Sequence, residues 1–108
     1  MEAAQHFRVA ADLDPKDVDI HISLGNVLRQ DGESAAAIKA YKQAMALDSS
    51  NRMAAYNLGG ILQDNFQEEK AIQCFNKTIQ IDPGYADAHY NLGICLETVG
   101  RLEVRGIP

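Results

Sequence analysis

The residues that most often catalyse reactions or bind metals are few in this chain, and their spacing suits neither role. The three histidines, His6, His21 and His89, lie far apart in the sequence. The two cysteines, Cys74 and Cys95, have no CxxC partner and no nearby histidine, and we expect buried, reduced thiols. A metal site needs several such ligands at one point, and a nucleophile needs an adjacent base. We therefore predict no metal, no cofactor and no enzymatic activity.

Hydrogen bonding by side-chain amides is the chemistry that the spacing does favour. Asn57 and Asn91 each precede a Leu-Gly pair and are separated by 34 residues, and Ser23 occupies the corresponding earlier place. An amide side chain both donates and accepts hydrogen bonds. A row of such amides can therefore bind an extended peptide backbone without reading its sequence, provided that regular elements place them in line.

A fixed interval supplies that regularity. The pairs Leu24-Gly25, Leu58-Gly59 and Leu92-Gly93 recur every 34 residues. A constant period of roughly 20–50 residues is the signature of a stacked repeat. Apolar residues three and four apart predict helices, and strand alternation is absent. The predicted helices cover residues 2–13, 17–30, 34–47, 51–64, 68–81 and 85–98.

Turn residues separate these helices. Asp14-Pro15 and Asp82-Pro83 end one helix and lead to the next, because the residue before proline is disfavoured in the α region. Gly32 and Gly100 are expected at tight turns that need a left-handed residue. Phe66 occupies the corresponding place in the middle repeat. We therefore expect that turn to be less tight, or the helix to persist through it.

The repeated glycines lie in the middle of predicted helices, where glycine costs about 1 kcal/mol relative to alanine. Three such glycines at one position of the repeat predict a neighbouring helix too close for a Cβ. We expect Ala37 and Ala71 to be the small residues at that approach. Tyr41 and Phe75 are expected to fill the wider gaps beside it.

These residues together resemble the tetratricopeptide repeat family, whose unit is a 34-residue helix–turn–helix with a Leu-Gly pair, an alanine, an aromatic residue and a proline. In the first full unit the resemblance rests on Leu24, Gly25, Leu28, Ala37, Tyr41 and Ala44. In the second it rests on Leu58, Gly59, Leu62, Ala71, Phe75 and Pro83. The resemblance implies an all-α fold: a right-handed α-solenoid (TPR superhelix) of stacked antiparallel helix pairs, truncated at both ends.

The expected division of the chain follows the repeat. The repeat array covers 1–103. It consists of the second helix of a partial repeat at 1–17, full repeats at 18–51 and 52–85, and the first helix of a partial repeat at 86–103. A non-repeat tail follows at 104–108. The tail breaks the period, because Arg105 stands where the family has alanine and Gly106 and Pro108 follow it. We therefore expect a fragment or an altered end of a longer repeat protein, with an uncovered apolar face on the helix 85–98.

Composition limits the partners. The net charge of −5 disfavours nucleic acid, whose partners need a basic surface. No stretch approaches the ~20 apolar residues of a membrane span, and the N-terminus does not resemble a signal peptide. These observations predict a cytoplasmic or nuclear protein and leave protein partners open.

The family resemblance implies that the first helix of each unit lines a concave groove in which a partner's peptide or helix docks. The expected partner-binding residues are Asp19, Ser23, Asn26, Arg29, Tyr56, Asn57, Asp64, Asp87, Tyr90 and Asn91. Because Asp19, Asp64, Asp87 and Glu97 outweigh Arg29, we expect a neutral or basic peptide. The main functional hypothesis is a protein-interaction scaffold.

Other readings stay open at this point. Asn57 and Asn91 also resemble the asparagine ladder of O-linked N-acetylglucosamine transferases, which would make the chain the substrate-docking part of a longer enzyme. A third reading is a non-functional fragment, and exposed apolar faces at both ends favour end-to-end self-association. The carboxylate grip of chaperone co-factors is rejected, since Ile22, Asp87 and Asn91 stand where that grip needs basic residues.

Overall fold

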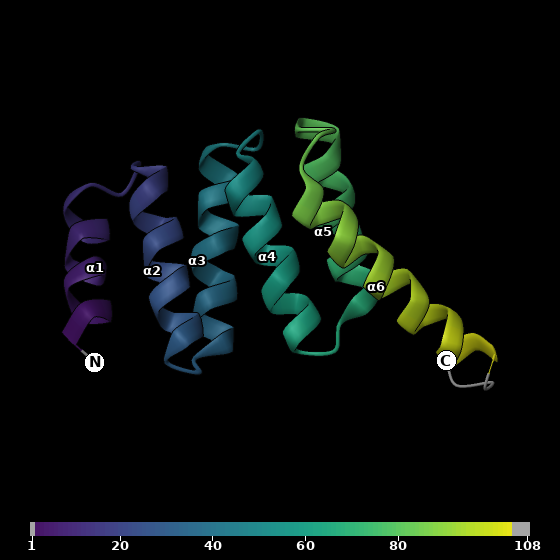
Figure 1. Ribbon diagram of the computed structural model, residues 1–108. Coiled ribbons are helices and arrows are strands. Elements are labelled where there is room, and N and C mark those ends of the chain that lie inside the picture. Colours follow the sequence, from purple (N-terminus) through teal and green to yellow (C-terminus); the bar gives the residue numbers. More distant parts are fainter. Residues whose placement is uncertain (1, 105–108) are drawn as a thin grey trace.

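The computed structural model describes residues 2–104, which form six α-helices in a row (Figure 1). The helices are α1 (Glu2–Leu13), α2 (Val18–Gln30), α3 (Ser34–Leu47), α4 (Arg52–Asp64), α5 (Glu68–Ile81) and α6 (Ala86–Val104). All the predicted boundaries agree with these to within one residue, except the end of α6.

Short polar side chains cap the N-termini of α2 and α4. The Asp17 carboxylate accepts hydrogen bonds from the backbone N–H groups of Asp19 at 3.0 Å and Ile20 at 3.4 Å, at the start of α2. The Asn51 side chain accepts from Ala54 N–H at 3.0 Å at the start of α4. Each cap satisfies donors that the first helical turn leaves unpaired. The sequence therefore determines where both of these helices start.

The helices form two rows. Each helix contacts the next one along the chain, and in addition α2 contacts α4 and α4 contacts α6. Within residues 2–104, the helices α1, α3 and α5 do not contact one another in this way. The row formed by α2, α4 and α6 is therefore the more closely spaced one, and the array curves around it. This row is called the inner row, and it lines the concave face. The described part is elongated, with extents of 49 × 28 × 19 Å, and it is an all-α helical-repeat solenoid.

Aromatic rings, rather than alanines, lie against the repeated glycines. A Cβ added to Gly25 would lie 2.5 Å from Cε1 of Tyr41, and one added to Gly59 would lie 2.8 Å from Cε1 of Phe75. Both rings are fully buried. The predicted close approach is therefore confirmed at these two glycines, but the expected placing of the aromatic side chains beside it was wrong. An alanine has no reach across a helix pair, whereas a flat ring fits directly onto bare helix backbone.

The turn between α4 and α5 is as tight as the one between α2 and α3, so the expected loosening at Phe66 was wrong. Phe66 adopts φ 62° and Gly32 adopts φ 79°. The same backbone hydrogen bonds close both turns, including Glu33 N–H to Leu28 at 2.9 Å and Gln67 N–H to Leu62 at 2.9 Å. Packing of the flanking helices therefore imposes a left-handed conformation that a phenylalanine adopts only at a cost.

The expected turn at Gly100 is also absent, because α6 continues through it to Val104. Figure 1 shows the far end of α6 extending beyond α5. Glycine permits a turn but does not require one, and within residues 2–104 no helix after α6 packs back to hold it. The expected break of the repeat period at Arg105 lies outside the described residues.

The face of α6 equivalent to the packed faces of α2 and α4 is uncovered. Leu96 is 54% exposed, whereas the corresponding Leu28 and Leu62 are 2% and 5% exposed. A Cβ added to Gly93 would meet nothing within 4 Å, so no close approach occurs at this third glycine. In the described residues, no helix combines the length and the hydropathy needed to cross a membrane.

Candidate functional site

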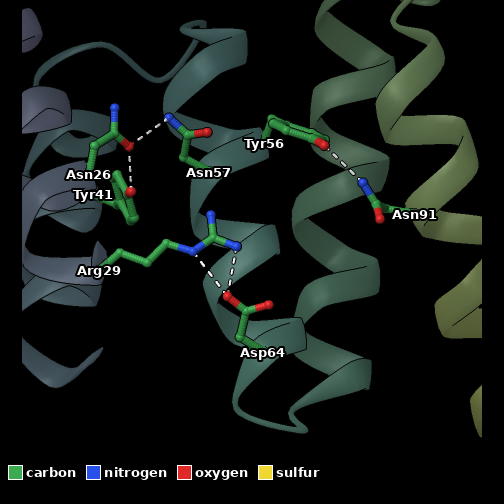
Figure 2. Close-up of polar contacts among 7 residues, drawn as sticks. All are labelled: Asn26, Arg29, Tyr41, Tyr56, Asn57, Asp64 and Asn91. Carbon is green, nitrogen blue, oxygen red and sulfur yellow. Dashed lines mark hydrogen bonds and ion pairs between the residues drawn. The ribbon is translucent and has the colours of Figure 1, made fainter. Parts of the chain in front are cut away.

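The expected partner-binding residues all lie on the inner row of helices. Those on α2 are Asp19, Ser23, Asn26 and Arg29, those on α4 are Tyr56, Asn57 and Asp64, and those on α6 are Asp87, Tyr90 and Asn91. Their contacts fall into two groups. Those between α2 and α4 are called the α2–α4 step, and those between α4 and α6 are called the α4–α6 step. Figure 2 shows the contacts at both steps.

Asn26 is the centre of the α2–α4 step. Its Oδ1 accepts a hydrogen bond from the Tyr41 hydroxyl at 2.5 Å and a longer one from Asn57 Nδ2 at 3.4 Å. Burial raises the pKa of Tyr41, and the nearby Arg29 partly opposes that rise. The hydroxyl is therefore protonated at neutral pH and available as the donor. Tyr41, which sequence reasoning treated only as a gap filler, thus fixes Asn26 through its buried hydroxyl.

Arg29 and Asp64 form an ion pair across the same step. Arg29 donates from Nε at 3.0 Å and from a terminal nitrogen at 2.7 Å, both to Oδ2 of Asp64. Gly60 makes room for this arrangement, since a Cβ there would lie 3.1 Å from a guanidinium nitrogen of Arg29. The two charges neutralise each other. A shallow pocket lined by Asn26, Arg29, Gln30 and Asp64 lies beside them.

The α4–α6 step has a different composition. Asn91 Nδ2 donates to the Tyr56 hydroxyl at 2.8 Å and to the backbone carbonyl of Asp87 at 3.0 Å. The Tyr56 ring packs at a tilt against Phe75 and Tyr85, with centroid separations of 5.7 Å and 5.1 Å. Burial, followed by the negative charge of Asp87, raises the pKa of Tyr56. Tyr56 is thus a neutral phenol held rigidly by its neighbours.

Asn57 and Asn91 donate hydrogen bonds to different neighbours. Asn57 bonds towards α2, whereas Asn91 bonds Tyr56 and its own helix. Their Oδ1 atoms accept no hydrogen bond from any described residue. Figure 2 shows each amide oxygen directed away from the bond that its nitrogen makes. Two acceptors thus stay available on the concave face.

The charges of this face are only partly paired. Arg29 neutralises Asp64, and Arg101 lies 3.3 Å from Glu97 on the same helix. Asp19 and Asp87 form no ion pair within residues 2–104. Both are exposed and occupy the same position of the repeat.

Two apolar side chains of the inner row of helices are exposed. Tyr90 is 71% exposed. Met53, the α4 residue at the repeat position of Asp19 and Asp87, is 51% exposed. Sequence reasoning missed Met53, although its place in the period was a usable signal.

His21, His89 and the two cysteines make contacts that are typical of structural residues. His21 Nε2 lies 2.9 Å from the Pro15 carbonyl, and His89 Nε2 lies 2.9 Å from the Pro83 carbonyl, so each ring bridges the loop before its helix. Burial raises the pKa of Cys74 and of Cys95, which keeps both thiols protonated and weakly nucleophilic. The described residues contain no group of side chains that could hold a metal ion.

Stacked antiparallel helix pairs with a fixed 34-residue period define the class of α-solenoid repeat proteins. A family model described as "TPR repeat" matches residues 25–65 and 67–100. The chain therefore belongs to the tetratricopeptide repeat family. No curated protein matches it in sequence.

Several solved structures share the fold. A crystal structure of MamA protein aligns with a TM-score of 0.88 and 30% identity, over 92% of this chain and 54% of that one. The crystal structure of YrrB, described as a TPR protein with an unusual peptide-binding site, aligns with a TM-score of 0.83 and 26% identity, over 94% of this chain and 53% of that one. The chain thus spans only about half the length of these relatives.

A more distant structure is the first TPR of Spaghetti (RPAP3) bound to an HSP90 peptide. It aligns with a TM-score of 0.88 and 18% identity, over 92% of this chain and 79% of that one. At this identity the likeness shows the shared fold alone.

Proposed function

We propose that this chain is a non-catalytic protein-interaction scaffold that binds an extended peptide segment of a partner protein on the concave face formed by α2, α4 and α6. One observation carries the proposal: the amide oxygens of Asn57 and Asn91 accept no hydrogen bond within the described residues. A peptide backbone offers N–H donors at regular intervals, which such acceptors match. The peptide-binding site named for YrrB supports this reading of the family.

The contacts favour the α4–α6 step as the main binding region. There the exposed Tyr90 and Met53 offer apolar area beside the acceptors, and Tyr56 is already held in place. At the α2–α4 step, Arg29 binds Asp64. Asn26 accepts hydrogen bonds from Tyr41 and Asn57. A peptide would have to break those contacts before it could use the same groups.

The partner peptide is proposed to be neutral or basic. The preference rests on Asp19 and Asp87, because Asp64 is neutralised by Arg29 and Glu97 by Arg101. An acidic peptide such as one ending in a free carboxylate finds Asp87 where it would need a cation, so we propose that it is excluded.

The alternative reading, the substrate-docking segment of a longer glycosyltransferase, rests only on the resemblance of Asn57 and Asn91 to an asparagine ladder. We also propose the division into full repeats at 18–51 and 52–85.

A peptide array with systematically varied charge tests the scaffold function. The double variant Asn57→Ala with Asn91→Ala should lower binding of neutral and basic peptides about ten-fold or more, because two hydrogen bonds are lost.

Asn76→Ala is the matched control, since Asn76 is an exposed amide on α5, in the other row of helices. It should leave binding unchanged. Unchanged binding by the double variant would remove the groove as the binding site.

A further inference from the structure

The uncovered face of α6 has a defined shape. On α2 and α4 the equivalent faces are closed by the second helix of the same repeat, with the Tyr41 ring on Gly25 and the Phe75 ring on Gly59. On α6 the glycine is Gly93, and nothing lies within 4 Å of a Cβ placed there. Within residues 2–104, α6 thus presents a bare-backbone seat that fits an aromatic ring, bordered by the half-exposed Leu96.

The opposite end of the array presents the matching helix. Ala3 and Phe7 on α1 stand at the repeat positions of Ala37 and Tyr41. Ala37 and Tyr41 are both 0% exposed, whereas Ala3 is exposed and Phe7 is half-buried. The face of α1 that carries these residues corresponds to the face with which α3 covers α2. Phe7 packs in part against the apolar core of the array, and Ala3 stays exposed.

The residue types at the two ends of the array are also chemically compatible. Within the first repeat the Tyr41 hydroxyl bonds Asn26, so a polar group meets a polar group. At a junction that continues the repeat, the corresponding residues are Phe7 and Ile94. The hydroxyl and the amide are both replaced by apolar groups. No buried polar atom would therefore be left without a partner at the junction.

We propose that α1 of a second copy packs on α6 as α3 packs on α2, with Phe7 of the second copy seated on Gly93 of the first. The contact is heterologous, because two different faces meet. Each added copy leaves one free α6 face and one free α1 face, so association is open-ended and extends the solenoid. This inference does not depend on peptide binding, since the proposed junction uses neither Asn57 nor Asn91.

Two charge substitutions test the junction without disturbing the core of the monomer. Ala3→Glu places a charge on the free face of α1, and Leu96→Glu places one on the free face of α6; both residues are exposed in the single chain. Gln5→Glu and Ala86→Glu are charge-matched controls at exposed positions of the same helices. Analytical ultracentrifugation over a wide concentration range measures the mass of each protein.

The unmodified chain and both controls should show a mass that rises continuously with concentration. Each of the two variants alone should stay near the 11.8 kDa of one chain. An equimolar mixture of the two variants should form a 1:1 pair and stop there, because one sound junction remains and both outer ends are blocked. Circular dichroism should show that the helical content of both variants is unchanged.

Three results would overturn the proposal. The first is a monomeric unmodified chain at every concentration. The second is a dimer abolished by Leu96→Glu but not by Ala3→Glu, which would indicate two α6 faces meeting each other. The third is a mixture of the two variants that stays monomeric.

Discussion

The two full repeats have the same frame but different chemistry on their concave faces. Both pack a buried ring on a glycine, Tyr41 on Gly25 and Phe75 on Gly59. In the first repeat the ring carries a hydroxyl that bonds Asn26. In the second, the residue corresponding to Asn26 is Gly60, and the ring has no polar group.

This difference separates positions that build the solenoid from positions that are free to vary. The glycine, leucine and ring positions change little between repeats because close packing tolerates few volumes. The concave positions carry amide, glycine, arginine or tyrosine side chains, because positions that face solvent do not restrict the side-chain volume. Polar groups at the α2–α4 step bind one another, as Arg29 does Asp64. The second repeat leaves acceptors and apolar area available towards α6. Function is therefore expected to follow the second repeat.

The largest expected effect concerns the glycines. Gly25→Ala and Gly59→Ala should each lower the free energy of unfolding by about 1–3 kcal/mol, because the new Cβ overlaps a fully buried ring that has no room to move. Gly93→Ala should instead raise it by about 0.5–1 kcal/mol, because alanine favours helix and the site is open. Urea denaturation at low protein concentration measures all three. The same sign of change at all three positions would contradict the assigned packing.

A smaller effect is expected from exchanging the rings. Tyr41→Phe removes the hydroxyl that bonds Asn26 and should lower the free energy of unfolding by about 1 kcal/mol. The reciprocal Phe75→Tyr should bring no gain, since Gly60 offers no side-chain partner. Thermal denaturation of the two variants checks this. Equal effects of the two exchanges would mean that the polar contact in the first repeat contributes nothing.

The smallest effect is expected at the two turns. Phe66→Gly should raise the free energy of unfolding by about 0.5–1 kcal/mol, because it relieves a left-handed phenylalanine that is 85% exposed and packs on little. Gly32→Phe should lower it by a similar amount. Chemical denaturation of both variants provides the measurement. A loss of stability in Phe66→Gly would reveal a packing role that its exposure does not suggest.

The frame was predictable from the sequence because it depends on periodicity. The period and the apolar spacing located all six helices, and the Leu-Gly pairs located the close approaches at Gly25 and Gly59. Local residue types were a weaker guide where tertiary packing decides. Packing closed the turn at Phe66 against its residue type, whereas α6 passes through Gly100, where a Cβ would meet no described atom within 4 Å.

The site was only partly predictable. Its positions followed from the period, including Asn57 and Asn91. Their partners did not, because a hydrogen bond such as Asn91 to Tyr56 depends on how far one inner helix lies from the next. The pairing of Arg29 with Asp64 likewise depends on the space at Gly60, which no periodicity reveals.

The central claim is that a peptide binds on the concave face at the α4–α6 step. The most direct measurement is a titration of isotope-labelled protein with the best neutral or basic array peptide, followed by backbone amide NMR shifts. The account predicts the largest shifts at 56–57 and 87–91, smaller ones around Asn26 and Arg29, and none along the outer surface of α3 and α5. Largest shifts on α3 or α5, with the concave face unchanged, would contradict it.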